Sequence, residues 1–191
     1  RSTPLYSSAA SDVYKRQADV GGMEAAFLSG PVFGRYGGTL VMRVRGEQRV
    51  LRLRHCVPIN VRLEGFRKEE TLRPCVAVGK AGVLCALEDS PGLTLIRPDG
   101  REIPIRFPSD LEDDPMLTLP VPAGFLAMMA VRGGGKIRVY LIGPDGGKEF
   151  QQDIARRPRR DIADDILLRK DDSGIWLVVG EESPILFPEE R

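Results

Sequence analysis

The chain has 191 residues, of which 42% are hydrophobic and 29% are charged, and its 28 basic and 27 acidic residues nearly cancel. This composition is that of a globular protein and excludes a collagen-like, mucin-like or wholly disordered chain. The near-zero net charge removes the usual electrostatic reason for binding nucleic acid or a membrane surface. We therefore expect neither of these as a partner.

No membrane-spanning or secretion segment is visible in the sequence. The longest uncharged run lies between Asp114 and Arg132, and it is shorter than the roughly 20 apolar residues of a spanning helix. Pro115, Pro120 and Pro122 interrupt it further. The N-terminus lacks the basic and then apolar pattern of a signal peptide. We expect no membrane insertion and a cytoplasmic location.

The three cysteines, Cys56, Cys75 and Cys85, cannot all pair with one another. Each lies among apolar or β-branched neighbours, which favours buried free thiols in a reducing compartment over a disulfide. The sequence has no C-x-x-C pair, and His55 is the only histidine. It therefore predicts no zinc site and no other metal or cofactor site.

Residues 1–17, RSTPLYSSAASDVYKRQ, have no usable apolar period. The six residues Asp12–Gln17 resemble the in-frame translation of the transposase end sequence used to build sequencing libraries. This resemblance implies a non-native, disordered tail on a metagenomic fragment, with a true protein that extends beyond it. A natural flexible tail is the alternative, and Met23 is a candidate start.

A glycine followed by a mostly apolar run occurs four times in the rest of the chain. The glycines are Gly38, Gly82, Gly124 and Gly174, with spacings of 44, 42 and 50 residues. A second apolar segment begins 11 or 12 residues after each glycine. Because all four keep the same register, the pattern predicts an internal repeat in which each glycine-led strand pairs antiparallel with the following segment. The expected glycine-led strands run near 39–45, 82–88, 124–131 and 174–180.

The period of the apolar residues identifies the elements as strands. Residues 59–64, 102–107 and 136–142 alternate between apolar and mostly polar side chains, which places the apolar set on one face of a sheet. The runs after Gly82 and Gly124 are apolar throughout, which is typical of strands covered on both faces. Helix is expected to be nearly absent.

Each unit has the size of one β-propeller blade, with four short antiparallel strands. The expected fold is all-β: a partial β-propeller of about four four-stranded blades, the last without its outer strand. The blades are assigned to residues 32–64, 75–107, 117–154 and 165–187 of a propeller region that covers 18–191. Glu24–Leu28 is a candidate closing strand. Without closure we expect an open arc with free edges at 185–187 and 32–33.

Two tight Pro-Asp-Gly turns and one tryptophan motif carry a family resemblance. Residues 95–102 (LIRPDGRE) and 141–149 (LIGPDGGKE) resemble the strand–turn segments of bacterial β-propeller repeat proteins. Asp171–Trp176 (DDSGIW) is similar to the D-x-x-G-x-x-W signature of two-component-regulator propeller blades and to an Asp-box, with the tryptophan one residue early in both. The resemblance implies that Trp176 packs between blades, with a ligand platform as the alternative.

Two acidic groups and one basic group are candidate binding residues. The acidic groups, which could supply oxygen ligands to Ca²⁺, are Asp110, Glu112, Asp113 and Asp114, and Asp164, Asp165, Asp171 and Asp172. The central glycine of a calcium loop is missing, which favours a solvated connection and turns. The basic group, which suits phosphates or an acidic partner, is Arg156, Arg157, Arg159 and Arg160. Asp153 and Asp161 flank it and favour a solvated loop.

Two further patterns are interpreted structurally. The glycine-rich stretches 132–136 and 143–148 are expected to be turns, because the spacing of a phosphate loop and its Ser or Thr are missing. His55 and Cys56 are adjacent in a strand, so their side chains point to opposite faces and cannot form a catalytic pair.

The sequence thus assigns no catalytic, cofactor or metal residues. It favours a propeller-type binding or interaction scaffold for a protein or small-molecule ligand, without hydrolase activity and prone to oligomerise through open edges. One alternative is a fragment of a propeller hydrolase or lactonase whose catalytic blades are missing. Another is a ligand-sensing module of a bacterial signalling protein, suggested by the signature at 172–176.

Overall fold

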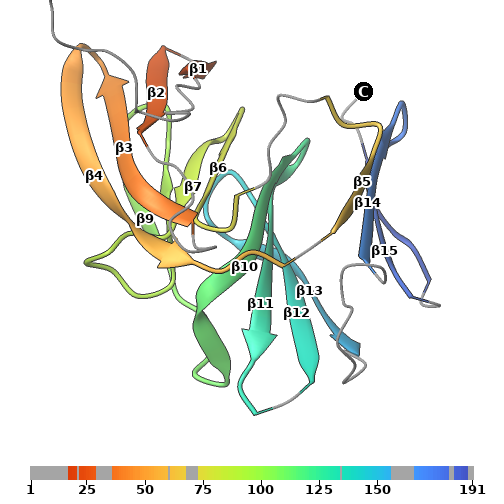
Figure 1. Ribbon diagram of the computed structural model, residues 1–191. Coiled ribbons are helices and arrows are strands. Elements are labelled where there is room, and N and C mark those ends of the chain that lie inside the picture. Colours follow the sequence, from red (N-terminus) through yellow and green to blue (C-terminus); the bar gives the residue numbers. More distant parts are fainter. Residues whose placement is uncertain are drawn as a thin grey trace, which may run out of the picture.

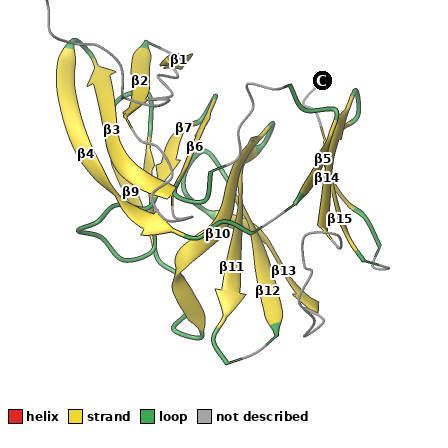
Figure 2. Ribbon diagram, viewed as in Figure 1, coloured by secondary structure: helices red, strands yellow, loops and turns green. Residues whose placement is uncertain are grey.

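The computed structural model describes residues 17–20, 22–28, 36–59, 61–67, 73–133, 135–155, 166–180 and 183–188. These ranges contain strands, turns and loops but no helix (Figure 1), as Figure 2 shows by its colours. The expected all-β class is confirmed. None of these ranges supplies a helix long and apolar enough to cross a membrane.

The strands form four four-stranded sheets, called the first to the fourth in chain order. The first contains β1 (Gln17–Val20), β2 (Met23–Leu28), β3 (Tyr36–Val44) and β4 (Glu47–Cys56). The second contains β6 (Val76–Gly79), β7 (Gly82–Cys85), β8 (Leu93–Ile96) and β9 (Glu102–Ile105). The third contains β10 (Leu111–Val121), β11 (Gly124–Val131), β12 (Lys136–Ile142) and β13 (Lys148–Ala155). The fourth contains β14 (Ile166–Asp171), β15 (Gly174–Val179), β16 (Ile185–Pro188) and β5 (Arg62–Glu64).

The glycine-led strands pair as the sequence predicts. β3 pairs with β4, β7 with β8, β11 with β12, and β15 with β16, each time antiparallel. The glycines at 38, 82, 124 and 174 have φ values of 129°, 129°, 145° and 136°, which L side chains rarely adopt. A Cβ at Gly124 would lie 2.1 Å from the Ile142 carbonyl oxygen. At this position the close approach of the neighbouring strand requires glycine.

Alternate residues of β11 enter two different cores. Phe125, Ala127 and Met129 belong to a core shared with the first and second sheets. Leu126 and Met128 belong to a core shared with the fourth sheet. The third sheet is therefore covered on both faces, as its continuous apolar run predicts.

The second sheet lies between the first and the third. Ile103 lies in one cross-strand row with Leu84 and Leu95, and a Cβ at Gly146 of the third sheet would be 2.7 Å from its Cγ2. Glu102 precedes Ile103 in β9, so its side chain points to the opposite face of the second sheet. On that face Glu102 forms an ion pair with Arg49 of the first sheet. The four sheets thus stack face to face in chain order.

The Pro-Asp-Gly turn of one sheet packs on the preceding sheet at two places. Gly100 of the second sheet approaches Val44 of the first, and Gly146 of the third approaches Ile103 of the second. The same turn sequence therefore makes the same kind of contact at both interfaces.

The first sheet differs from the expected unit at 32–64. It covers residues 17–56, and β2 pairs with β1 and β3, so the segment 24–28 is not a strand that closes the fourth sheet. The expected last strand of this unit, β5, instead pairs in parallel with β14. The reason lies in the chain after Cys56: the Ile59 amide donates to the Met116 carbonyl of β10 at 3.0 Å and carries the chain toward the fourth sheet.

The edges of the sheets agree only in part with the open arc that the sequence predicts. β16 pairs only with β15 in the described part of the chain, so its other edge has no strand there. The inner edge of β14, by contrast, is covered by β5. The expected edge at 32–33, residues 1–16 of the tail and the arginine group at 156–160 lie outside the described residues, as do Asp164 and Asp165. Gln17, the last residue of the expected disordered tail 1–17, instead begins β1 and pairs with Ala26.

Candidate binding pocket

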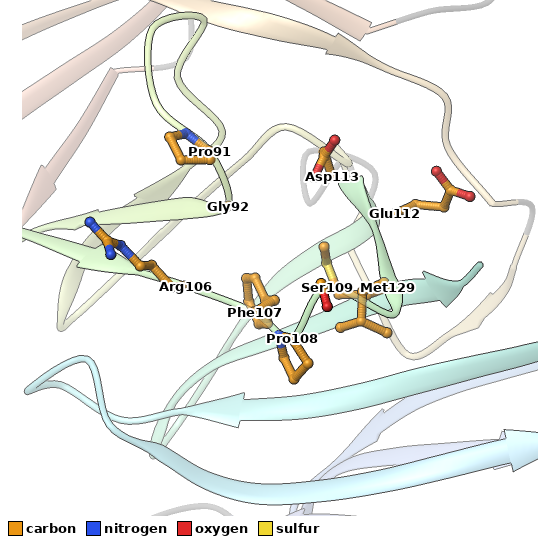
Figure 3. Close-up of a pocket in the computed structure, with 10 residues that line it drawn as sticks. Pro91, Gly92, Arg106, Phe107, Pro108, Ser109, Glu112, Asp113 and Met129 are labelled. Carbon is orange, nitrogen blue, oxygen red and sulfur yellow. The ribbon is translucent and has the colours of Figure 1, made fainter.

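A pocket of about 250 Å³ lies where the second and third sheets meet the loops at one end of the stack. Phe107 and Met129 contribute apolar side chains to its lining, together with Pro91. Arg106 and Glu112 also line it, and they lie on opposite sides of Phe107 (Figure 3). The pocket therefore offers an apolar surface between two charges of opposite sign.

Phe107 is held in place by the third sheet. Its ring packs against Tyr140, with ring centroids 4.9 Å apart, and the Lys148 ammonium lies 5.6 Å from its centroid. Lys148 Nζ also donates to the Arg106 carbonyl at 2.8 Å. These contacts fix the segment that carries the apolar side of the pocket.

The acidic run at 110–114 is paired with arginines. Asp110 contacts Arg138 at 3.0 Å, and Asp113 contacts Arg132 at 3.2 Å. Asp114 in turn lies 3.5 Å from Arg54 Nε. Because each of these carboxylates faces a guanidinium, they are poorly suited to hold Ca²⁺. The described residues contain no group of three or more potential metal ligands.

The expectation that this run is an inter-blade loop is wrong. Residues 112–114 lie inside β10, which begins at Leu111 and has register shifts on both sides of Pro115. The irregular pairing leaves three successive side chains exposed, which a regular strand with one buried face would not do. Arg54 joins this strand to the opposite side of the pocket, because its Nη2 donates to the Gly92 carbonyl.

Glu112 and Arg106 are the two charged residues of the pocket lining that have no ion pair in the described part of the chain, whereas Asp113 pairs with Arg132. The side chains of Glu112 and Arg106 are both exposed. A bound molecule can therefore pair with either charge without breaking an existing contact.

The electrostatics beside the pocket centre on Arg138. This guanidinium donates to both oxygens of Asp153 and to Asp110. Its hydrogen bonds lower the pKa of the Asp153 carboxyl, and the same contacts raise the pKa of Arg138 itself. Burial is the main cause that raises the pKa of the Tyr140 hydroxyl. All three groups keep their neutral-pH charge states over a wide pH range.

His55 and Cys56 do not meet. His55 is exposed and Cys56 is buried, as expected for adjacent residues of a strand. All three cysteines are buried and free. Burial raises the pKa of the Cys56 thiol to about 12 and that of Cys75 to about 11, and it also raises the pKa of Cys85. None of them is a thiolate nucleophile at neutral pH.

The described parts of the two glycine-rich stretches include turns, at 132–133 and 144–146. The Gly143 amide donates to the Gly147 carbonyl at 2.8 Å, and Asp145 accepts from the Gly147 amide at 2.8 Å. Arg132 follows β11 and donates through Nε to the Leu111 carbonyl at 2.5 Å. These hydrogen bonds stabilise the two turns.

Asp171 fixes the tryptophan motif. It accepts hydrogen bonds from the Ser173 hydroxyl, from the Ser173 amide at 2.9 Å and from Trp176 Nε1 at 3.1 Å. These bonds, the one from the Ser173 hydroxyl first among them, lower the pKa of the Asp171 carboxyl. Trp176 is half-buried and lies far along the chain from the residues that line the pocket.

Sequence reasoning missed the pocket residues Arg106, Phe107 and Met129. Phe107 belongs to an expected strand and Met129 to an expected core run, so neither stands out as a binding residue. β9 ends at Ile105, and Arg106, Phe107 and Pro108 follow it in the loop that lines the pocket. No local pattern of the sequence marks this loop as a binding site.

Comparison with protein-family models, with curated proteins and with solved structures finds no match to this chain.

Proposed function

We propose that the chain is a β-propeller-type scaffold that binds a protein partner at the pocket beside Phe107. The observation that carries the proposal is the stacking of four mostly antiparallel sheets in chain order, with the side chains of β11 divided between two cores. The recurring glycine conformation and the turn contacts at Gly100 and Gly146 support a blade repeat. Propellers present ligand sites on the loops at the ends of their blades.

The size of the pocket favours a side chain of a protein over a free small molecule. Small-molecule sites usually measure about 300–1,000 Å³, whereas this pocket measures about 250 Å³. Phe107 and Met129 would pack on an inserted apolar side chain. Arg106 and Glu112 would pair with charges on either side of it, where they add specificity.

A serine hydrolase site at this pocket would lack the histidine that usually acts as its base. Ser109 lines the pocket, but the only histidine of the chain, His55, does not. A serine nucleophile is weak without a base that removes its proton. The geometry therefore favours binding over the hydrolase alternative.

Selection of peptides from a random phage-displayed library tests the proposal. We expect peptides with an aromatic or long aliphatic residue next to a charge. Arg106→Glu and Glu112→Arg should each weaken their binding about tenfold or more, by removing one charge pair near an apolar contact. Arg101→Glu is the matched control, because this exposed residue lies at the other end of the β8–β9 hairpin.

Two results would contradict the proposal. One is that selection yields no binder, or only binders that are indifferent to both pocket variants. The other is ester or lactone hydrolysis by the wild-type chain that is lost in Ser109→Ala, which would support the enzyme alternative.

A further inference from the structure

The fourth sheet has one face in the core and one face outside it. Ile175, Leu177 and Phe187 belong to the core shared with the third sheet. Because side chains alternate along a strand, Trp176 and Val178 point to the opposite face. This outer face has no covering sheet among the described residues.

The outer face is apolar on its β15 and β16 side. Trp176 is the cross-strand neighbour of Leu186, and Val178 is that of Leu167. Leu186 is 37% exposed. These four side chains form a continuous patch across three strands, and cross-strand neighbours on one face lie in contact distance.

Trp176 is a preorganised anchor within this patch. Its indole N–H donates to Asp171 and to Ser173, each at 3.1 Å. The ring therefore loses little freedom when a partner covers it, and tryptophan is enriched among the residues that dominate interface energies.

The β5 side of the same face carries both signs of charge. Arg62 lies beside Leu167, and Glu64 lies beside Arg169. Arg62 and Glu64 are both exposed and are two positions apart on one strand, so they point to the same side. A two-fold axis crossing the strands between them would place Arg62 of each copy opposite Glu64 of the other, and Trp176 opposite Val178. The two β5 charges are thus complementary to those of the other copy, while Arg169, which pairs with Asp171, lies opposite Leu167.

We propose that the outer face of the fourth sheet docks a second copy of this chain, with Trp176 as its apolar anchor and reciprocal Arg62–Glu64 pairs. The outer face of the first sheet carries the exposed Glu24–Arg43 ion pair and has no tryptophan. This inference concerns a different surface from the proposed peptide pocket and does not depend on it.

The size of the face predicts a weak dimer. Four strands about 4.8 Å apart and six residues of about 3.3 Å give a face of about 400 Å². Stable complexes bury about 800 Å² per partner. We therefore expect dissociation constants of about 10–500 µM, with monomer prevailing at low concentration.

Concentration-dependent fluorescence and sedimentation velocity test the proposal. Trp176 is the only tryptophan of the chain, so its emission reports on this face directly. Between about 5 µM and about 1 mM, the emission should shift to shorter wavelength in parallel with dimer formation. Trp176→Ala should weaken dimerisation at least about tenfold by sedimentation. Val50→Ala, at an exposed position of the first sheet, should leave it unchanged.

Charge exchange gives a test that does not remove apolar surface. Arg62→Glu or Glu64→Arg alone should weaken the dimer, since like charges then face each other. The double exchange should restore it, and so should an equal mixture of the two single variants. A wild-type chain that stays monomeric up to about 1 mM would overturn the proposal. So would a dimer that is indifferent to Trp176→Ala and to both single exchanges.

Discussion

Arg138 is the residue on which most of the local electrostatics depend. From β12 it contacts Asp153 of β13 and Asp110, the turn residue before β10. Only 13% of its side chain is exposed, whereas both carboxylates are more accessible. The two carboxylates accept hydrogen bonds from the N–H groups of the largely shielded guanidinium. These bonds hold the strand ends beside the pocket in place.

The lowered pKa of Asp153 predicts a loss of stability in acid. A carboxyl with a lower pKa in the folded state stabilises the fold above its unfolded pKa of about 3.9, and this contribution disappears as pH falls through the folded value. Asp153→Asn should therefore lower the free energy of unfolding at pH 7 by about 1 kcal/mol, after allowance for solvent screening. The difference from wild type should shrink below about pH 4.

Urea titrations of both proteins between pH 3 and pH 7 measure this difference. Asp172→Asn, at an exposed turn position, is the control and should have the wild-type profile. A constant difference at all pH values would contradict the assigned charge interaction.

The buried thiols predict low reactivity in the folded chain. Thiol pKa values of about 12 at Cys56 and about 11 at Cys75 leave very little thiolate at pH 8. A disulfide reagent such as DTNB should therefore react only at the rate at which the protein opens, and with all three thiols in urea. Rapid reaction of one equivalent in native buffer would show that one thiol is accessible.

At the scale of the element, the glycine at the start of each glycine-led strand allows the neighbouring strand to approach closely, because glycine has no side chain. A Cβ at Gly82 would lie only 2.1 Å from the Ile96 carbonyl oxygen, and a Cβ at Gly124 would lie at the same distance from that of Ile142. The strand that follows can be apolar on both faces because sheets cover it on both sides.

Gly124→Ala should destabilise the protein by about 3 kcal/mol or more, since it combines an unfavourable φ with a backbone clash. Gly133→Ala is the control: its φ is also positive, but a Cβ there meets nothing within 4 Å. It should cost about 1 kcal/mol. If thermal or urea unfolding showed the same loss of stability for both variants, the close approach of β12 to Gly124 would contribute nothing to the effect of Gly124→Ala.

At the scale of the whole molecule, the segment after β4 links sheets that are distant in the chain. It hydrogen-bonds β10 at Ile59, pairs with β14 through β5, and returns to β10, where Arg73 forms a bridge with Thr118. Figure 1 shows β5 beside β14, at the opposite side of the view from β4. This crossing connects the fourth sheet to the N-terminal half.

Gly65→Ala should detach β5 from β14. Gly65 has a φ of 76°, and a Cβ would lie 2.0 Å from the Lys170 carbonyl oxygen. We expect faster hydrogen exchange in β5 and β14, with β12 unchanged, because local opening follows the loss of local contacts. Gly46→Ala, with a φ of 84° and open space, should not have this effect. Unchanged exchange in β14 would contradict the linking role of β5.

The sequence by itself determined the features that depend on neighbours in the chain. Alternation and the glycine register predicted the all-β class and the pairing of each glycine-led strand. The continuous run after Gly124 predicted coverage on both faces, and adjacency predicted that His55 and Cys56 point apart. These features follow from the two-residue period of a strand and from turn chemistry, which are local.

Only the tertiary structure decided the features that join distant segments. The partner of β5 lies about 100 residues away, and no local pattern distinguishes a strand of the first sheet from an added strand of the fourth. The arginines that pair with the acidic run come from β4, β12 and the turn after β11. The pocket joins residues whose local roles are structural, such as Phe107 and Met129. Stacking of the sheets brings these groups together, because the cost of closing long loops is repaid only by the shared cores.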